Sequence, residues 1–427
     1  MRTRCALLLI VCWTGVLFCQ STESQASRQK RWEQDIDAFV RAFSAGVGAR
    51  DPLGNLETRG QVDFERFYPP RQFKAEIAAL KQSVSARSDA EMVLELSRIV
   101  ANAHIAHTNV EIPRSMGFER VLPVQFRWFS DSMIVWLATP DYKQTIGLRV
   151  VKVGSMTPEE LEKAVAQFIS FENDVWLRWN STAVMTMQPV LQMLRLIDAD
   201  GCVRLTLSGR GEKELTIKLP FAENQRAWIG VFAALQIPFP MNFRQKDRNY
   251  WYRYLEDSQT AYVNFGNCVD DPRQPFADFV RAMMKDLDMK PVRRVVVDLM
   301  RNGGGNSDVI HPLMDALKAH RQWKGQIFVL IGPETFSAAV MAALRMKDEL
   351  HATLVGEAAG GKPGFYGFPG FVTLPNSQLV IRFTTKYTPA PAGMDRPVLI
   401  PDIPASMSTA DLFAGRDPAL DAAIAAR

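Results

Sequence analysis

The chain has 427 residues, with 50 Lys and Arg against 46 Asp and Glu, a net charge of +4, and 47% hydrophobic residues. At about 100 to 200 residues per domain, this length predicts two or three domains, each able to bury its own core. The near balance of charge excludes a protein built around phosphate neutralisation, so no nucleic-acid partner is expected. With 5 His and 5 Cys, the chain is also not a metal-rich or disulfide-dense scaffold, and we expect no metal or other cofactor.

The N-terminus has the features of a secretory signal peptide, which we place at residues 1–25. Two arginines precede an apolar stretch over residues 5–19 that is short for a bilayer-spanning helix. A bulky side chain precedes Cys19, which disfavours lipoprotein anchoring but leaves it open. We therefore expect an exported protein, periplasmic or secreted, with no membrane span once the signal is removed. Export permits a disulfide between Cys202 and Cys268, but the sequence decides neither this bond nor the oligomeric state.

Two regions of different pattern precede residue 223. Residues 26–118 carry apolar side chains at helical spacing, such as Ile36 and Phe39, and predict a small helical cap. Residues 119–222 contain short β-rich runs and predict a β module. A longer insertion over residues 168–198 interrupts the module, and its Trp and Met side chains predict either packed core or a lid over a cleft.

Residues 223–427 alternate strands and helices. Apolar strands are predicted at 295–299, 327–331 and 352–356, and each of the first two leads through a tight turn into a helix. This order is typical of an α/β unit whose strands are buried on both faces. Ligand chemistry in such units lies at the carboxyl ends of the strands, where both turns occur.

Ser337 lies where the second of these strands turns into its helix. A serine at such a junction has an accessible hydroxyl beside a free N–H at the positive end of the helix dipole, so a nucleophile and half of an oxyanion hole can be combined. Helix capping by Thr335 or Ser337 explains the same residues more simply. The turn at 301–306 (RNGGGN) offers unhindered N–H groups, either as a second oxyanion donor or as a purely structural turn.

Four motifs follow one another along this region: VDLMRNGGGN at 297–306, TFSAA at 335–339, LVGEAAGGK at 354–362 and PDI at 401–403. In this order and spacing they resemble the tail-specific, or C-terminal-processing, serine peptidase family. The resemblance covers about residues 250–420. More weakly, the β module resembles the PDZ-like domain of that family, and the helices before it resemble the family's N-terminal cap.

The resemblance implies an α/β, or α+β multidomain, fold with a catalytic core like that of ClpP and crotonase. It implies Ser337 as the nucleophile of peptide-bond hydrolysis. The tetrahedral intermediate would then be held by the N–H of Ala338 and by one from Gly303 or Gly304. The predicted organisation is a signal peptide, a helical cap, a PDZ-like β module with its helical insertion, and a catalytic core over residues 223–427.

The resemblance leaves two bases open. The processing-protease version has a lysine 25 residues after the serine, and Lys362 stands at that spacing. The tricorn-like version has a histidine from the N-terminal part and a late acid. AHIAHT at 103–108 resembles the family's histidine segment and places His107 there, with Asp395 where relatives carry glutamate. The glycine-rich stretch around Lys362 is more similar to the histidine-containing relatives, which favours His107.

The expected function is that of an exported serine endopeptidase acting on extended or unfolded polypeptides through an acyl-enzyme on Ser337. The alternative is a non-catalytic protein that binds a peptide or a small apolar ligand on the same scaffold. The β module lacks a clear carboxylate-binding loop, so classical binding of peptide C-termini by this module is doubtful.

Overall fold

The structure is a computed structural model that describes residues 24–45, 68–209, 213–223, 227–245, 247–323 and 326–426. Nearly all of the predicted signal peptide, with Cys19, lies outside these residues. Within the described ranges, no helix is both long enough and apolar enough to cross a membrane. Cys202 and Cys268 are both free, and Cys268 is buried, so the disulfide that export would permit is not formed.

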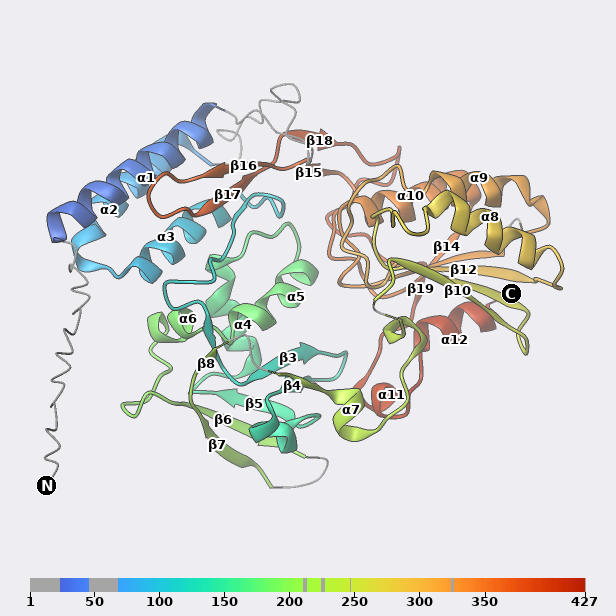
Figure 1. The fold of residues 1–427 in the computed structure, drawn as a ribbon, viewed down its shortest axis with the longest axis horizontal. Coiled ribbons are helices and arrows are strands. Elements are labelled where there is room, and N and C mark those ends of the chain that lie inside the picture. Colours follow the sequence, from blue (N-terminus) through green and yellow to red (C-terminus); the bar gives the residue numbers. More distant parts are fainter. Residues whose placement is uncertain are drawn as a thin grey trace, which may run out of the picture.

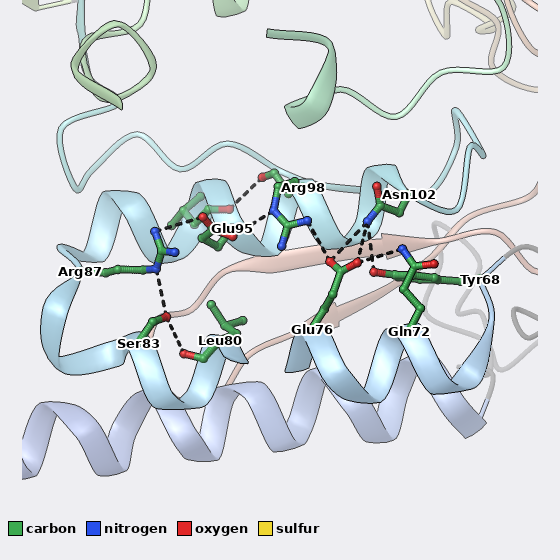
Figure 2. Close-up of polar contacts among 11 residues, drawn as sticks. Tyr68, Gln72, Glu76, Leu80, Ser83, Arg87, Glu95, Arg98 and Asn102 are labelled. Atoms are coloured by element: carbon green, nitrogen blue, oxygen red, sulfur yellow. Dashed lines mark hydrogen bonds and ion pairs between the residues drawn. The ribbon is translucent and has the colours of Figure 1, made fainter. Parts of the chain in front are cut away.

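Three helices form the N-terminal part: α1 (Gln25–Ala45), α2 (Pro70–Ser83) and α3 (Asp89–Ala101). The predicted apolar positions are the buried ones, since Ile36 and Phe39 are fully buried. Polar contacts join α2 to α3 (Figure 2). Arg98 Nη1 donates to Glu76 Oε2 at 2.8 Å, and Asn102 Nδ2 donates to the Tyr68 hydroxyl at 3.1 Å.

The β module is an antiparallel sheet in the order β3-β4-β5-β6-β7. Val203 pairs with Leu219 across the β6–β7 hairpin. Its strands are β3 (Val124–Trp128), β4 (Met133–Ala138), β5 (Arg149–Val153), β6 (Val203–Ser208) and β7 (Leu215–Leu219). The helices between β5 and β6 are α4 (Pro158–Val165), α5 (Asp174–Val184) and α6 (Gln188–Met193), and the last two form the predicted insertion.

The C-terminal core is a six-stranded sheet in the order β10-β11-β12-β13-β14-β19, parallel except for the pair β10 and β11. The strands are β10 (Tyr250–Leu255), β11 (Thr260–Phe265), β12 (Arg294–Asp298), β13 (Ile327–Ile331), β14 (Thr353–Gly356) and β19 (Ile403–Pro404). Helices α8 (Phe276–Leu287), α9 (His311–Ala319) and α10 (Ala338–Leu350) lie on one side of the sheet and α12 (Pro418–Ala425) lies on the other (Figure 1). The predicted strand, turn, helix order is therefore confirmed, as is the mixed α/β class.

A hairpin from the C-terminal half completes the N-terminal helical part. Strands β16 (Gly370–Thr373) and β17 (Val380–Phe383) pair, and β17 also pairs with β1 (Asn109–Val110) beside the helices (Figure 1). The buried carboxylate of Asp35 in α1 accepts the backbone N–H groups of Asn376 at 2.8 Å and Ser377 at 2.7 Å. The sequence-based division at residue 118 does not foresee this return of the chain.

Short elements connect these parts. The remaining strands are β2 (Arg120–Val121), β8 (Ala222–Glu223), β9 (Ile229–Gly230), β15 (Phe365–Gly367) and β18 (Lys386–Thr388). The remaining α-helices are α7 (Val231–Leu235) and α11 (Thr409–Phe413). The resemblances of the β module to PDZ and of the core to ClpP and crotonase stay predictions, as do the domain boundaries.

Candidate active site

Ser337 occupies the N-cap position of α10, directly after β13 and its short turn. Its backbone has φ 53° and ψ −122°, a conformation that residues other than glycine adopt at a cost of about 1–3 kcal/mol. Its side chain makes no capping bond. Thr335 Oγ1 instead donates to the carbonyl of Leu299 at 2.8 Å and accepts from the N–H of Gly332 at 2.9 Å. The capping interpretation is therefore wrong for both hydroxyls, and the strained turn presents Ser337 without using it structurally.

The glycine turn after β12 lies against this serine. An ideal Cβ on Gly304, which has φ 102°, would stand 2.8 Å from Ser337 Cβ and 3.0 Å from the nitrogen of Ala338. Buried Asn302 holds the two turns together, because its carbonyl accepts the N–H of Phe336 at 3.1 Å and its Oδ1 accepts the N–H of Gly304 at 2.9 Å. The backbone of Gly304 can therefore approach the nucleophile only because it carries no side chain.

The predicted oxyanion donors differ in availability. The N–H of Gly304 is already bonded to Asn302. Gly303 is exposed, and in the described part of the chain neither its N–H nor that of Ala338 has a recorded hydrogen-bond partner. Gly303 and Ala338 are thus the two predicted positions whose N–H groups are open to a ligand.

The turn between β13 and α10 carries Ser337, and we call it the nucleophile turn after the role predicted for this serine. His107 lies beside it and is buried, with 7% of its surface exposed. Among the described residues, neither Nδ1 nor Nε2 makes a hydrogen bond of standard geometry, although the backbone of Tyr366 lies close enough to interact with the ring. Burial lowers the pKa of His107 to about 4, the charge of Arg382 lowers it further, and the backbone of Tyr366 opposes the shift. The imidazole is therefore neutral at pH 7, with a free nitrogen that can accept a proton.

The ring of His107 belongs to a column of four nearly parallel rings. Trp176 of α5 stacks on Phe336 with centroids 3.9 Å apart, and Phe336 stacks on His107 at 4.5 Å. His107 in turn stacks on Phe365 at 5.2 Å. Because Phe336 directly precedes Ser337, this column couples the insertion and the N-terminal part to the nucleophile turn.

The loop that follows β14 covers the other side of the turn. An ideal Cβ on Gly361 would come 3.3 Å from the nitrogen of Ser337. Lys362 is half-buried and lines a cavity of about 300 Å³ together with Glu172. Burial raises the pKa of Glu172 to about 7, the charge of Lys362 opposes this rise, and Glu172 Oε2 has no hydrogen-bond partner in the ranges described.

Asp395 lies at the edge of this region. It is exposed, and its Oδ1 stands 2.9 Å from the position that a Cβ on Gly364 would take. No hydrogen bond within the described ranges links Asp395 to His107, or links Ser337 to His107 or Lys362. The structure thus brings His107 and the glycine-rich loop of Lys362 against the nucleophile turn, and it leaves the predicted acid at the rim.

Helix α5 of the insertion also contacts the turn. Asn173 Nδ2 donates to the carbonyl of Gly360 at 3.0 Å, and Trp176 covers Phe336. The sequence marks the insertion only as core or lid and does not single out Glu172 or Trp176 as neighbours of the site. No signal in the sequence relates these residues to Ser337, because the contacts span about 160 positions of the chain.

Together these features are typical of one class of protein, a serine hydrolase of mixed α/β fold, with Ser337, the predicted nucleophile, on a strained strand-to-helix turn. No group of three His, Cys, Asp or Glu side chains able to hold a metal ion occurs among the described residues.

The model of Peptidase family S41 matches residues 308–405, which include Ser337, Lys362 and Asp395. This match covers part of the C-terminal core, confirms the resemblance to the tail-specific, C-terminal-processing peptidases, and supports a serine-type peptidase. A search of curated proteins returned no match.

Two solved structures of CPAF show the same fold at low sequence identity. Mature CPAF is 12% identical with a TM-score of 0.57, over 91% of this chain and 94% of CPAF. Mature CPAF complexed with lactacystin is 12% identical with a TM-score of 0.55, over 91% and 96%. The photosystem II D1 C-terminal processing protease is 15% identical with a TM-score of 0.42, over 91% and 98%. At these identities the likeness to CPAF concerns the fold alone.

Proposed function

We propose that this peptidase is an exported endopeptidase that cleaves extended or unfolded polypeptides through an acyl-enzyme on Ser337. The observation that carries the proposal is the strained backbone of Ser337, whose hydroxyl caps nothing and whose neighbour Ala338 has an open N–H. A strained conformation without a structural use is typical of a position held for chemistry.

In the proposed reaction, Ser337 Oγ attacks the carbonyl carbon of the scissile bond while a base takes the hydroxyl proton. The N–H groups of Ala338 and Gly303 stabilise the oxyanion. The base then gives the proton to the leaving amine, and water hydrolyses the acyl-enzyme by the same route.

His107 is the base that the geometry supports better. Its buried imidazole is neutral, its nitrogens make no hydrogen bond of standard geometry among the described residues, and it stacks on the residue next to Ser337. Hydrogen bonds to a catalytic base are commonly long in unliganded enzymes and tighten when substrate binds. Asp395 would orient the imidazole, and Lys362 would bind substrate near Glu172. If Lys362 is the base instead, His107 serves only as packing under Phe336.

Single substitutions separate these roles. Ser337→Ala should abolish both hydrolysis of an unstructured polypeptide and labelling by a phosphonyl-type serine probe. His107→Ala should lower kcat by at least about 100-fold, while His320→Ala, a histidine at the C-terminal end of α9, should leave kcat unchanged. A Lys362→Ala variant that loses as much activity as the Ser337 variant, with His107→Ala active, would reverse the assignment of the base.

The same probe tests the alternative of a non-catalytic binding protein. That alternative is favoured by one observation, the lack of a hydrogen bond between Ser337 and either candidate base. A folded protein that is not labelled and does not hydrolyse any peptide would support it. Export is tested separately. The protein recovered outside the cytoplasm should have a mass that corresponds to the loss of about the first 25 residues.

A further inference from the structure

A cavity of about 400 Å³ lies at the carboxyl end of the parallel sheet, between the core and the β module. On the core side it is lined by Arg301 after β12, Glu334 after β13 and Glu357 after β14. On the other side it is lined by Arg127 of β3 and by α5. Because Glu334 stands three residues before Ser337, this cavity borders the nucleophile turn without containing the predicted catalytic residues.

Two guanidinium groups in the cavity share one carboxylate. Arg127 Nη2 donates to Glu334 Oε1 at 3.1 Å, and Arg301 Nε donates to the same oxygen at 3.4 Å. The side chain of Arg127 is only 17% exposed, and no other hydrogen bond from it is recorded among the described residues. A guanidinium has five N–H donors, so these three groups leave several donors unmatched. The second carboxyl of the cavity is that of Glu357, whose pKa is raised by burial.

Aromatic rings hold both guanidiniums in place. The guanidinium of Arg127 lies 5.0 Å from the ring centroid of Trp136, 4.8 Å from that of Trp179 and 5.2 Å from that of Phe243. The guanidinium of Arg301 lies over the same Phe243 ring, 4.8 Å from its centroid. Such stacking fixes the plane of a guanidinium, and a fixed fork is suited to a carboxylate.

The cavity also contains an unpaired polar atom. Asn242 is 5% exposed and lines the cavity, and its Oδ1 has no hydrogen-bond partner in the described part of the chain. Its Nδ2 donates to Met300 Sδ, at 3.7 Å. A buried acceptor without a partner costs about 1–3 kcal/mol, so an N–H donor from a ligand would be stabilised there. The cavity thus offers donors for an anion and an acceptor for an amide.

We propose that this cavity is a substrate subsite that takes the carboxylate of an Asp or Glu side chain, held by Arg127 and Arg301, while Asn242 accepts a peptide N–H. The inference rests on the proposed peptidase function, and it adds a preference for acidic residues near the cleaved bond. Glu357 opposes this binding when it is ionised, because its carboxyl lines the same cavity, where it accepts the N–H of Met407 at 3.4 Å. A free chain terminus offers the same chemistry as an acidic side chain, so the experiment must separate the two.

The test uses internally quenched peptides that differ only by Glu or Gln at one position, scanned along the sequence, each with an amidated C-terminus. A charge-assisted hydrogen bond is worth about 1.5–3 kcal/mol, so at one position kcat/KM should be about 10- to 100-fold higher for Glu. Arg127→Gln should bring this ratio close to one, and Glu357→Gln should increase it. Arg98→Gln is the matched control, since it removes a half-buried ion pair with Glu76 in the N-terminal helices (Figure 2) and should leave the ratio unchanged.

Equal kcat/KM for Glu and Gln at every position in the unmodified enzyme would overturn the subsite and leave the peptidase function intact. A preference that appears only with a free C-terminal carboxylate would overturn the side-chain assignment. The comparison of Glu and Gln and the Glu357→Gln variant keep the test valid if Arg127→Gln does not fold. If no peptide is cleaved, the peptidase proposal fails, and the affinity of Ser337→Ala for the same peptides still decides the subsite: equal affinities for Glu and Gln overturn it.

Discussion

Gly304→Ala is the substitution that tests the arrangement around Ser337 most directly. A methyl group at this position would lie 2.8 Å from Ser337 Cβ, 2.9 Å from the carbonyl oxygen of Phe336 and 3.0 Å from the nitrogen of Ala338. All three atoms belong to the nucleophile turn, and two of them are backbone. No side-chain rotation can relieve the contact, so the turn itself must move.

Two contributions set the size of the effect. Alanine at φ 102° costs about 1–3 kcal/mol in backbone strain. Normal contact begins at 3.4 Å, so Ser337 Cβ must move away by 3.4 minus 2.8, or about 0.6 Å. Displacements of about 1 Å cost roughly 100-fold in rate. We therefore expect kcat to fall by about 10- to 100-fold with little change in KM, and the free energy of unfolding to fall by about 1–3 kcal/mol.

The neighbouring glycine provides the control. An ideal Cβ on Gly303 meets no atom within 4 Å, and its φ is not in the left-handed region, so Gly303→Ala should fold and keep its N–H in place. Steady-state hydrolysis of a quenched peptide and urea unfolding of both variants measure the two effects. Equal loss of activity in the two variants, or a Gly304→Ala enzyme with kcat within twofold of the parent, would show that the close approach of the turns is not needed for catalysis.

Three further predictions concern the rest of the molecule. Burial raises the pKa of Asp298 from 3.8 to about 7; its stabilising contribution is therefore complete below about pH 4 and lost as the pH rises through 7. Asp298→Asn should consequently gain stability relative to the parent between pH 5 and pH 8, by about 3 kcal/mol, in urea unfolding at both pH values. Trp176→Ala should lower the unfolding free energy by at least about 1 kcal/mol, because Phe336 loses its stacking partner, and it should affect kcat more strongly than KM. Trp176→Phe should restore most of the stability and of kcat. A reducing agent should leave the melting temperature unchanged, because Cys202 and Cys268 are free.

The sequence was sufficient to predict the core, because its signals are local. The strands β12, β13 and β14 are short apolar runs buried on both faces, and each of the first two is followed by a turn and an apolar-periodic helix. The capping box of Thr157 and Glu160 at the start of α4 is an equally local feature. Ser337 is found by the same means, since its motif and its strand-to-helix position coincide.

The surroundings of Ser337 were not predictable in this way, because they depend on contacts between distant segments. No local sequence pattern predicts the pairing of β1 with β17 or the hydrogen bonds that Asp35 accepts from Asn376. Asn302 reads as one residue of a glycine turn, and only the structure shows that it joins that turn to Phe336. Composition likewise says nothing about which of the chain's arginines becomes buried.

These distant contacts bear on what must be present for the nucleophile turn to hold its shape. The strained backbone of Ser337 persists only if its neighbours hold it, and Phe336 is held between His107 of the N-terminal part and Trp176 of the insertion. Neither ring belongs to the predicted core of residues 223–427. A fragment limited to that core would contain the serine, both glycine turns and Lys362, yet it would lack both rings that pack on Phe336. The strained backbone of Ser337 would then be held only by contacts within the core, such as those of Asn302, Thr335 and Gly361, so the intact chain is the unit in which the activity should be measured.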